Sequence, residues 1–337
     1  MSSPNLTSAQ SYAKRKRVDS TTEVDVPAIR SSDFWFEDGN VVLQAQSKQF
    51  RVHRSVVARH STVFRDMFSL PQPEGDDLLD GCPIVHVTDA SKDWEKLFTI
   101  LYNPETIYQS ADSGNFDLDA LSSILRLGKK YELDKLYDAA LKRISQEIPV
   151  SLHQWVQKFG YGVKLPSPLT GKEVELLNTL LDLEIQPLLP VAYFLCIKSL
   201  TLKNILEVML PSATHKVERK HFSSGLSQDS VRTLILGREA TGRAMMEHTF
   251  GWLTTDSSVC SNCISKKRCA NRMSELRDLF LSMLTMDIVD DVFEPVRELD
   301  LCGQCQIQIR VYYKVGCQKV WEGLPTYFGL PPWKDLK

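Results

Sequence analysis

Residues 33–68 read DFWFEDGNVVLQAQSKQFRVHRSVVARHSTVFRDMF, and a change of period within this stretch decides the fold. An aliphatic run at 41–43 and an apolar–polar alternation at 50–52 are typical of two half-buried strands joined by a polar turn. Apolar residues then recur at helical spacing: Val56, Val57, Phe64, Met67 and Phe68. The stretch therefore predicts a β-hairpin followed by a helical pair, with Ser61 as an N-cap.

The same two periods continue towards residue 150. Residues 82–87 predict a third strand, and residues 94–102 predict a helix with one apolar face. Two more helices are expected, because apolar residues recur three and four positions apart within 118–131 and again within 133–144. Strands and helices in this order indicate a domain of the α+β class.

This part of the chain resembles a BTB/POZ domain in the order of its elements and in several motifs. The motifs are FRVHR at 50–54, SxxFRxMF at 61–68 and KKYEL at 129–133. The resemblance covers about residues 33–147 and is strongest to the large fungal (basidiomycete-type) group, which has Asp-Gly-Asn at the first hairpin and an LPxxFGLPxW ending. It implies a short mixed sheet flanked by helices and a function in protein–protein interaction.

Composition and periodicity divide the chain into three parts. Residues 1–30 are polar and predict a disordered tail, residues 31–150 form the BTB/POZ domain, and residues 151–337 form a mainly α-helical, cysteine-bearing region. Large apolar residues alternate with prolines at 321–333. This pattern predicts an ordered, non-helical strap packed on the helical region, and the alternative is a docking motif offered to a partner.

The tail carries a compact basic run. Its members are Lys14, Arg15, Lys16 and Arg17. Such a run outside any folded element is typical of a nuclear localisation signal, and the alternative is a solvated charge run. No apolar segment typical of secretion is present at the N-terminus, and the most apolar stretch, 188–197, is too short to span a bilayer. We therefore expect a nuclear or otherwise cytoplasmic protein with no membrane contact.

Five cysteines after residue 255 have spacings typical of a metal site. They are Cys260, Cys263, Cys269, Cys302 and Cys305. Zinc prefers four thiolate or imidazole ligands, and one C-x-x-C turn supplies two of them. We predict a structural zinc bound by Cys302 and Cys305 with two of the other three. Resemblance to the fungal group, whose first pair is more widely spaced, favours Cys269 with either Cys260 or Cys263.

Two other roles remain open for these cysteines: small buried side chains, or a redox or disulfide function. Cys82 and Cys196 are isolated in the sequence, and Cys317 lies on a predicted helix. We expect all three to be core residues.

The sequence contains no motif for nucleotide binding, serine hydrolysis or zinc-dependent proteolysis, and His53 is expected to be packed rather than catalytic. The predicted function is therefore non-enzymatic: a nuclear scaffold or regulator that acts through its BTB/POZ domain. One alternative is a substrate adaptor of a cullin-type ubiquitin ligase, although residues 69–74 match the cullin-binding pattern poorly. The other is a DNA-binding transcription regulator that uses the cysteine module and nearby cations. These cations are Lys266, Lys267, Arg268, Arg272 and Arg277.

The expected partners are other proteins, and the oligomeric state stays open. Dimerising BTB/POZ domains of the transcription-factor type carry a helix and a strand before the first hairpin, and residues 12–32 show no such pattern. Those domains also often place an aspartate beside an arginine matching Arg51, where this chain has Asn40. The resemblance therefore does not favour a swapped homodimer. The net charge of −2 gives no general support for nucleic-acid binding.

Overall fold

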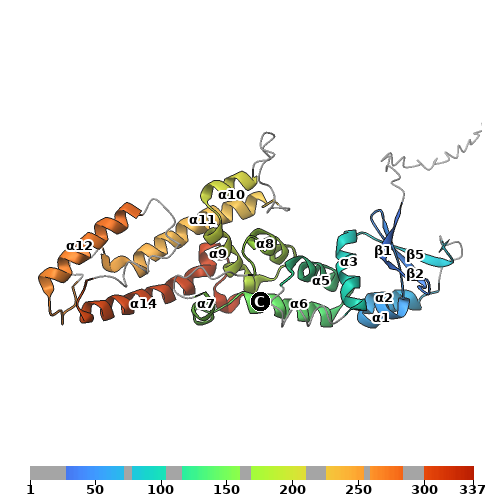
Figure 1. The fold of residues 1–337 in the computed structure, drawn as a ribbon, viewed down its shortest axis with the longest axis horizontal. Helices are drawn as coiled ribbons and strands as arrows, with labels where there is room; N and C mark the ends of the chain where they lie inside the picture. Colours follow the sequence, from blue (N-terminus) through green and yellow to red (C-terminus); the bar gives the residue numbers. More distant parts are fainter. Residues whose placement is uncertain are drawn as a thin grey trace, which may run out of the picture.

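The computed structural model describes residues 28–71, 78–103, 116–159, 168–209, 225–253, 259–283 and 300–337. The molecule is elongated, with a β-sheet at one end and the helices α12 (Lys266–Met283) and α14 (Gly303–Tyr327) at the other (Figure 1). The basic run of the N-terminal tail lies outside the described residues. Within those residues, no helix is both long and apolar enough to cross a membrane.

The sheet has five strands in the order β1-β3-β2-β5-β4. The predicted hairpin is formed by β2 (Val41–Ala45) and β3 (Lys48–Val52), which pair antiparallel. The predicted third strand, β5 (Cys82–Val87), runs parallel to β2, and the short β4 (Leu78–Leu79) pairs antiparallel with β5. Parallel and antiparallel pairs occur together, so the sheet is mixed, as expected.

The strand β1 (Ile29–Trp35) differs from the sequence analysis, which expects no strand before the hairpin. It runs parallel to β3 of the same chain, with a register shift between Arg30 and Trp35. Only Ser31 and Phe34 in this strand are buried, three positions apart, so the two-residue alternation that identifies a half-buried strand is missing. Pairing with a neighbouring strand, rather than its own apolar pattern, makes this segment a strand.

Two short helices follow the hairpin, as predicted: α1 (Arg54–His60) and α2 (Thr62–Ser69). Ser61 is the N-cap of α2, because its hydroxyl oxygen accepts the N–H of Phe64 at 3.1 Å. The same hydroxyl donates to the carbonyl of Tyr131 at 2.6 Å. One serine therefore fixes both the start of α2 and its position against the helix that ends at Tyr131.

An aromatic cluster fills the space between the sheet and the helices. Phe64 from α2 and Trp94 from α3 (Ser91–Tyr102) are buried, with ring centroids 5.8 Å apart. Phe64 also lies 4.9 Å from the ring of Tyr131, the last residue of α5 (Leu118–Tyr131). This cluster fixes the helices on the sheet, and its burial confirms the apolar faces expected from the sequence.

The rest of the described chain is helical. Its helices are α6 (Asp134–Glu147), α7 (Leu152–Phe159), α8 (Glu173–Asp182), α9 (Leu189–Ser199), α10 (Leu202–Met209), α11 (Gln228–Ala244), α12 and α14. Short single-turn helices lie at Gln186–Leu188, Met245–Thr249, Gly251–Leu253 and Trp333–Asp335. This arrangement confirms an α+β end with a short mixed sheet, followed by a mainly α-helical region.

One apolar core joins the two halves. It includes Leu125 and Ile144 from α5 and α6 together with Leu177, Val191 and Trp321 from α8, α9 and α14. The core therefore continues across residue 150, where the sequence analysis divides the chain. That division remains a prediction, and the packing on both sides of it is continuous.

The helix α14 crosses the end of α11 at very close range. A Cβ atom at Gly316 would lie 2.3 Å from the carbonyl oxygen of His248, so only glycine fits this position. His248 lies in the π-helical turn Met245–Thr249 that follows α11. The widened turn and the glycine together let α14 run from the central core to the far end of the molecule (Figure 1).

The C-terminal segment packs on the helical region as predicted, but its first part is helical. The helix α14 continues through Pro325 to Tyr327, where the sequence analysis expects a non-helical strap from residue 321. Proline has no N–H to donate to the carbonyl four residues earlier, that of Trp321. The indole N–H of Trp333 donates to this carbonyl instead, at 2.8 Å, while its ring stacks on Trp321. This substitute hydrogen bond explains why the helix tolerates Pro325.

Candidate metal centre

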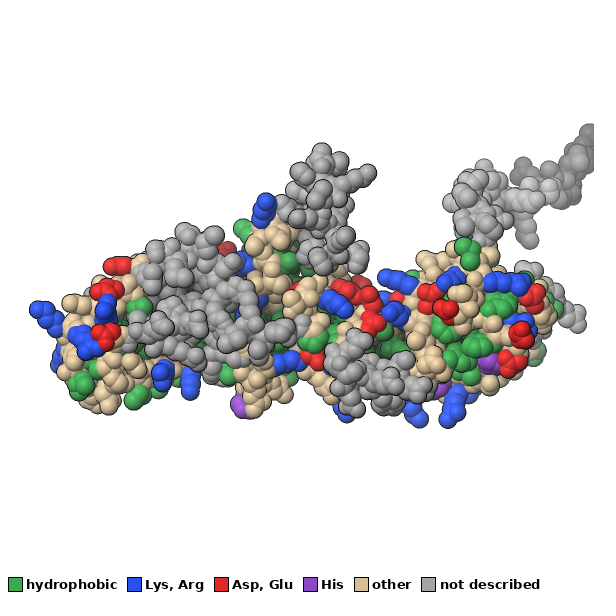
Figure 2. All heavy atoms as spheres, in the orientation of Figure 1, with side chains coloured by type: hydrophobic (Ala, Val, Ile, Leu, Met, Phe, Trp, Pro, Cys, Tyr) green, Lys and Arg blue, Asp and Glu red, His purple; other side chains and the backbone are tan. Residues whose placement is uncertain are grey.

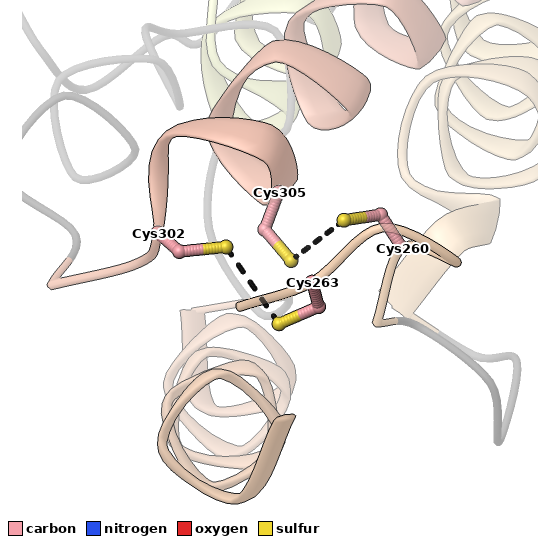
Figure 3. A group of neighbouring side chains, drawn as sticks. All are labelled: Cys260, Cys263, Cys302 and Cys305. Carbon is pink, nitrogen blue, oxygen red and sulfur yellow. Dashed lines mark hydrogen bonds between the residues drawn. The ribbon is translucent and has the colours of Figure 1, made fainter. Parts of the chain in front are cut away.

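Four cysteines meet at the far end of the molecule, where the loop before α12 reaches the start of α14 (Figure 3). Cys260 and Cys263 come from the loop, Cys302 is the N-cap residue of α14, and Cys305 lies in its first turn. Their four sulfur atoms lie within 4.8 Å of one another and point towards a common centre. The structure thus combines the two C-x-x-C pairs of the sequence.

Local backbone geometry explains why each pair presents two sulfurs together. In the loop, the N–H of Cys263 donates to the carbonyl of Cys260 at 3.1 Å, which closes a tight turn. In α14, the N–H of Gln306 donates to the carbonyl of Cys302 at 3.0 Å, which opens the helix. Positions i and i+3 share one side of a turn or helix, so each pair acts as a two-sulfur clamp.

The sulfur spacing fits a tetrahedral metal ion. A zinc–sulfur bond of about 2.3 Å places tetrahedral ligand sulfurs roughly 3.8 Å apart. The sulfurs of Cys263 and Cys302 are 3.6 Å apart, and those of Cys260 and Cys305 are 3.3 Å apart. Both separations are far above the roughly 2.05 Å of a disulfide bond, and all eight cysteines of the chain are free thiols. Four thiols with no other donor between them suit a soft or borderline divalent ion such as zinc.

The thiols of the cluster differ in acidity. The backbone of Cys305, in the first turn of α14, lowers the pKa of the Cys302 thiol to about 6 through a hydrogen bond. Burial raises the pKa of Cys305 and that of Cys263. One thiolate is therefore favoured at neutral pH, and a divalent cation is needed to hold all four sulfurs as thiolates.

Cys269 lies beside this group but outside it. Its side chain is fully buried on α12, and its sulfur accepts the N–H of Cys302 at 3.3 Å. The sequence analysis favours Cys269 as a ligand, whereas the structure places both Cys260 and Cys263 in the four-sulfur group. The compact turn formed by Cys260 and Cys263 accounts for the difference, because it brings both sulfurs to one point and leaves Cys269 to pack against the backbone of α14.

Packing and one ion pair reinforce the cluster. The buried side chains of Met273, Leu301 and Ile309 pack around the cysteines. The guanidinium of Arg268 on α12 pairs with the carboxylate of Asp300, two residues before Cys302. The cluster therefore joins the loop before α12, and α12 itself, to the start of α14.

The cations near the cluster are partly neutralised. Arg268 pairs with Asp300, and Arg272 pairs with Glu275. Lys266 and Lys267 are exposed. Two of the five cations considered for DNA contact thus have carboxylate partners, which reduces the positive charge of this face.

The remaining cysteines and His53 lie where the sequence analysis expects them. Cys82 and Cys196 are buried in the core, and burial raises the pKa of the half-buried Cys317 to about 11. The ring nitrogens of His53 contact the hydroxyl of Tyr102 at 3.0 Å and the carboxylate of Asp38 at 3.1 Å. These contacts hold the ring of His53 in place.

The comparisons with known proteins agree with the fold at the sheet end of the molecule. This end combines a mixed sheet, a capped helical pair and two covering helices. Residues 36–148 match the family model described as the BTB/POZ domain, and this part of the chain is a BTB/POZ domain. A search of curated proteins finds no match to the chain. The assignment to a fungal group therefore stays a prediction.

Proposed function

We propose that this protein is a non-enzymatic scaffold or regulator that binds other proteins through its BTB/POZ domain. The observation that carries the proposal is the BTB/POZ domain itself, which is a protein-interaction module. The continuous core behind it supports a scaffold, because it attaches a helical region firmly to the binding domain.

The outer face of α2 offers a starting surface for partner binding. The helix turns Phe64 into the core and leaves Val63 outside, 36% exposed; Leu70, the C-cap residue that follows the helix, is 65% exposed. Exposed aliphatic side chains on a binding module contribute to association when a partner covers them. A basic residue, Arg65, lies between them in sequence and is also exposed.

Affinity purification of the full chain from its native host tests this function. Proteins recovered with the wild type should be lost with the double variant Val63→Glu and Leu70→Glu. They should be retained with Leu202→Glu, a matched change of an exposed leucine on α10. Mass spectrometry reads the result. The proposal would be contradicted if the wild type recovered no more proteins than a tag-only control. It would also be contradicted if the wild type, the double variant and Leu202→Glu all recovered the same proteins.

The same purification separates the two alternative functions. Recovery of a cullin would favour a ubiquitin-ligase adaptor, which the poor match at residues 69–74 does not support. Steeply salt-dependent binding of duplex DNA would favour a transcription regulator. The ion-paired arginines near the cysteine cluster weigh against this second alternative.

We also propose that Cys260, Cys263, Cys302 and Cys305 bind one structural zinc ion. The converging sulfurs and their spacing support it. Four protein thiolates leave no coordination position for water, so the ion would have no catalytic role. It would hold the loop at 259–265 to the start of α14.

The nuclear location is proposed from the basic run Lys14, Arg15, Lys16 and Arg17. Replacing these four residues with alanine should move a fluorescent fusion of the full chain from the nucleus to the cytoplasm, because a receptor reads the clustered charge. Changing Lys334 and Lys337 at the C-terminus to alanine gives a control. Unchanged nuclear accumulation of the first variant would show that the run is only a solvated segment.

A further inference from the structure

The outer face of α14 carries an apolar stripe that no part of the described structure covers. Ile307, Val311 and Val315 lie four residues apart, one above the other, and are 57%, 54% and 51% exposed. Tyr312, beside them, is 50% exposed. The opposite face of the same helix holds its buried residues. These are Cys305, Ile309, Tyr313, Gly316, Val320, Trp321, Leu324 and Pro325.

Neither helix propensity nor solvation explains the stripe. Isoleucine and valine lose side-chain freedom in a helix, so at an exposed position they are poorer helix formers than lysine, glutamate or glutamine. The one gain they offer is burial, which exposure to water removes. Three such residues in one row on a helix therefore indicate a surface that is covered by something outside the described structure.

The charge beside the stripe is of one sign. Arg310, Lys314 and Lys319 are exposed on α14, and the helix has no acidic residue before Glu322. None of these three cations forms an ion pair within the described residues. Along the lower edge of the α14 end, Figure 2 shows hydrophobic and basic side chains and no acidic ones.

These two features specify the chemistry of the covering molecule. A row with four-residue spacing matches the apolar face of a second helix, which packs its own side chains between Ile307, Val311 and Val315. The cations at the border have no ion-pair partner among the described residues, and carboxylates on the flanks of that helix would complement them. A second copy of this chain fits poorly, because packing α14 on α14 would bring Arg310 and Lys314 close to their own counterparts.

We propose that the face formed by Ile307, Val311, Tyr312 and Val315 is a docking surface for an acidic amphipathic helix of a partner protein. This surface lies at the opposite end of the molecule from the BTB/POZ domain and goes beyond the function proposed for that domain. The cysteine cluster lies at the start of the same helix, so it holds the surface in place.

The proposal can be tested with a fluorescent peptide of about 20 residues. This peptide carries leucine at three- and four-residue spacing and glutamate on the flanks of its apolar face. Anisotropy should show binding to the full chain, with weaker binding at high salt. Val311→Glu with Val315→Glu should weaken binding about tenfold or more, and Arg310→Glu with Lys314→Glu should do the same. These side chains are exposed, so circular dichroism should show an unchanged fold.

Two controls make the test specific. Leu236→Glu, at an exposed leucine of α11, should leave binding unchanged. A peptide with lysine in place of glutamate should not bind. Equal binding of the two peptides, or full binding by the Val311→Glu and Val315→Glu variant, would overturn the proposal. The proposal would also be overturned if sedimentation showed a concentration-dependent dimer of the wild type that the Val311→Glu and Val315→Glu variant does not form. A second copy of the chain would then be the molecule that covers this surface. Failure of the wild type to bind the acidic peptide would overturn it as well.

Discussion

Replacing Cys302 with serine should release the proposed zinc ion and unfold the far end of the molecule. A serine hydroxyl is not deprotonated near neutral pH and does not replace a thiolate ligand of zinc. Structural zinc contributes on the order of 10–16 kcal/mol to the folding of small metal-dependent domains, so its loss removes the main tie between the loop and α14. Elemental analysis should fall from one zinc per chain to nearly none, and limited proteolysis should newly cut near residues 259–283.

Two neighbouring cysteines provide matched controls for this experiment. Cys317→Ser changes a half-buried thiol on the same helix and should retain the metal. Cys269→Ser distinguishes the two ligand sets: it should retain zinc if the four-sulfur group of the structure is the site, and lose zinc if Cys269 is a ligand. Wild-type protein with reduced cysteines and well under one zinc per chain, or with iron instead, would refute the zinc site.

Phe64→Ala should destabilise the BTB/POZ domain by about 3–5 kcal/mol, the usual range for a large buried aromatic side chain. The ring lies against Trp94 and Tyr131, and its removal leaves a cavity between two rigid rings that cannot easily close. Denaturant unfolding of the full chain, followed by its tryptophan fluorescence, to which the buried Trp94 contributes, measures the change. The cap of α2 is unaffected, because it uses the backbone N–H of residue 64.

The neighbouring residue gives the control for this prediction. Val63 is partly exposed on the other face of α2, so Val63→Ala should change the free energy of unfolding by less than about 1 kcal/mol. A loss below about 1 kcal/mol for Phe64→Ala itself would show that its face of the helix is not buried as described.

The sequence predicts those elements whose apolar residues keep a regular period. The hairpin, α2 and α5 follow directly from such spacing, and Ser61 is recognisable as a cap because a short hydroxyl residue precedes a helical pattern. The strand β1 cannot be found in this way. It lies at the edge of the sheet and buries two residues three positions apart, so its conformation depends on pairing with β3.

The cysteine site and the C-terminus show a second limit of sequence reasoning. Spacing identifies five candidate cysteines, but the choice among Cys260, Cys263 and Cys269 depends on how the loop turns before α12. Pro325 predicts the end of a helix from local chemistry alone. A residue eight positions further on, Trp333, supplies the missing hydrogen bond and lets the helix continue. Both differences arise from contacts between segments that no local pattern encodes.

The apolar core that runs from α5 to α14 has a mechanical consequence. A chain with a flexible linker behind its binding domain lets two bound molecules move independently and meet at many separations. Here the side chains pack together on both sides of residue 150. The helices between the sheet end and the cysteine end therefore form a stiff spacer. A protein bound at the sheet end is therefore held at a fixed distance and angle from the cysteine end.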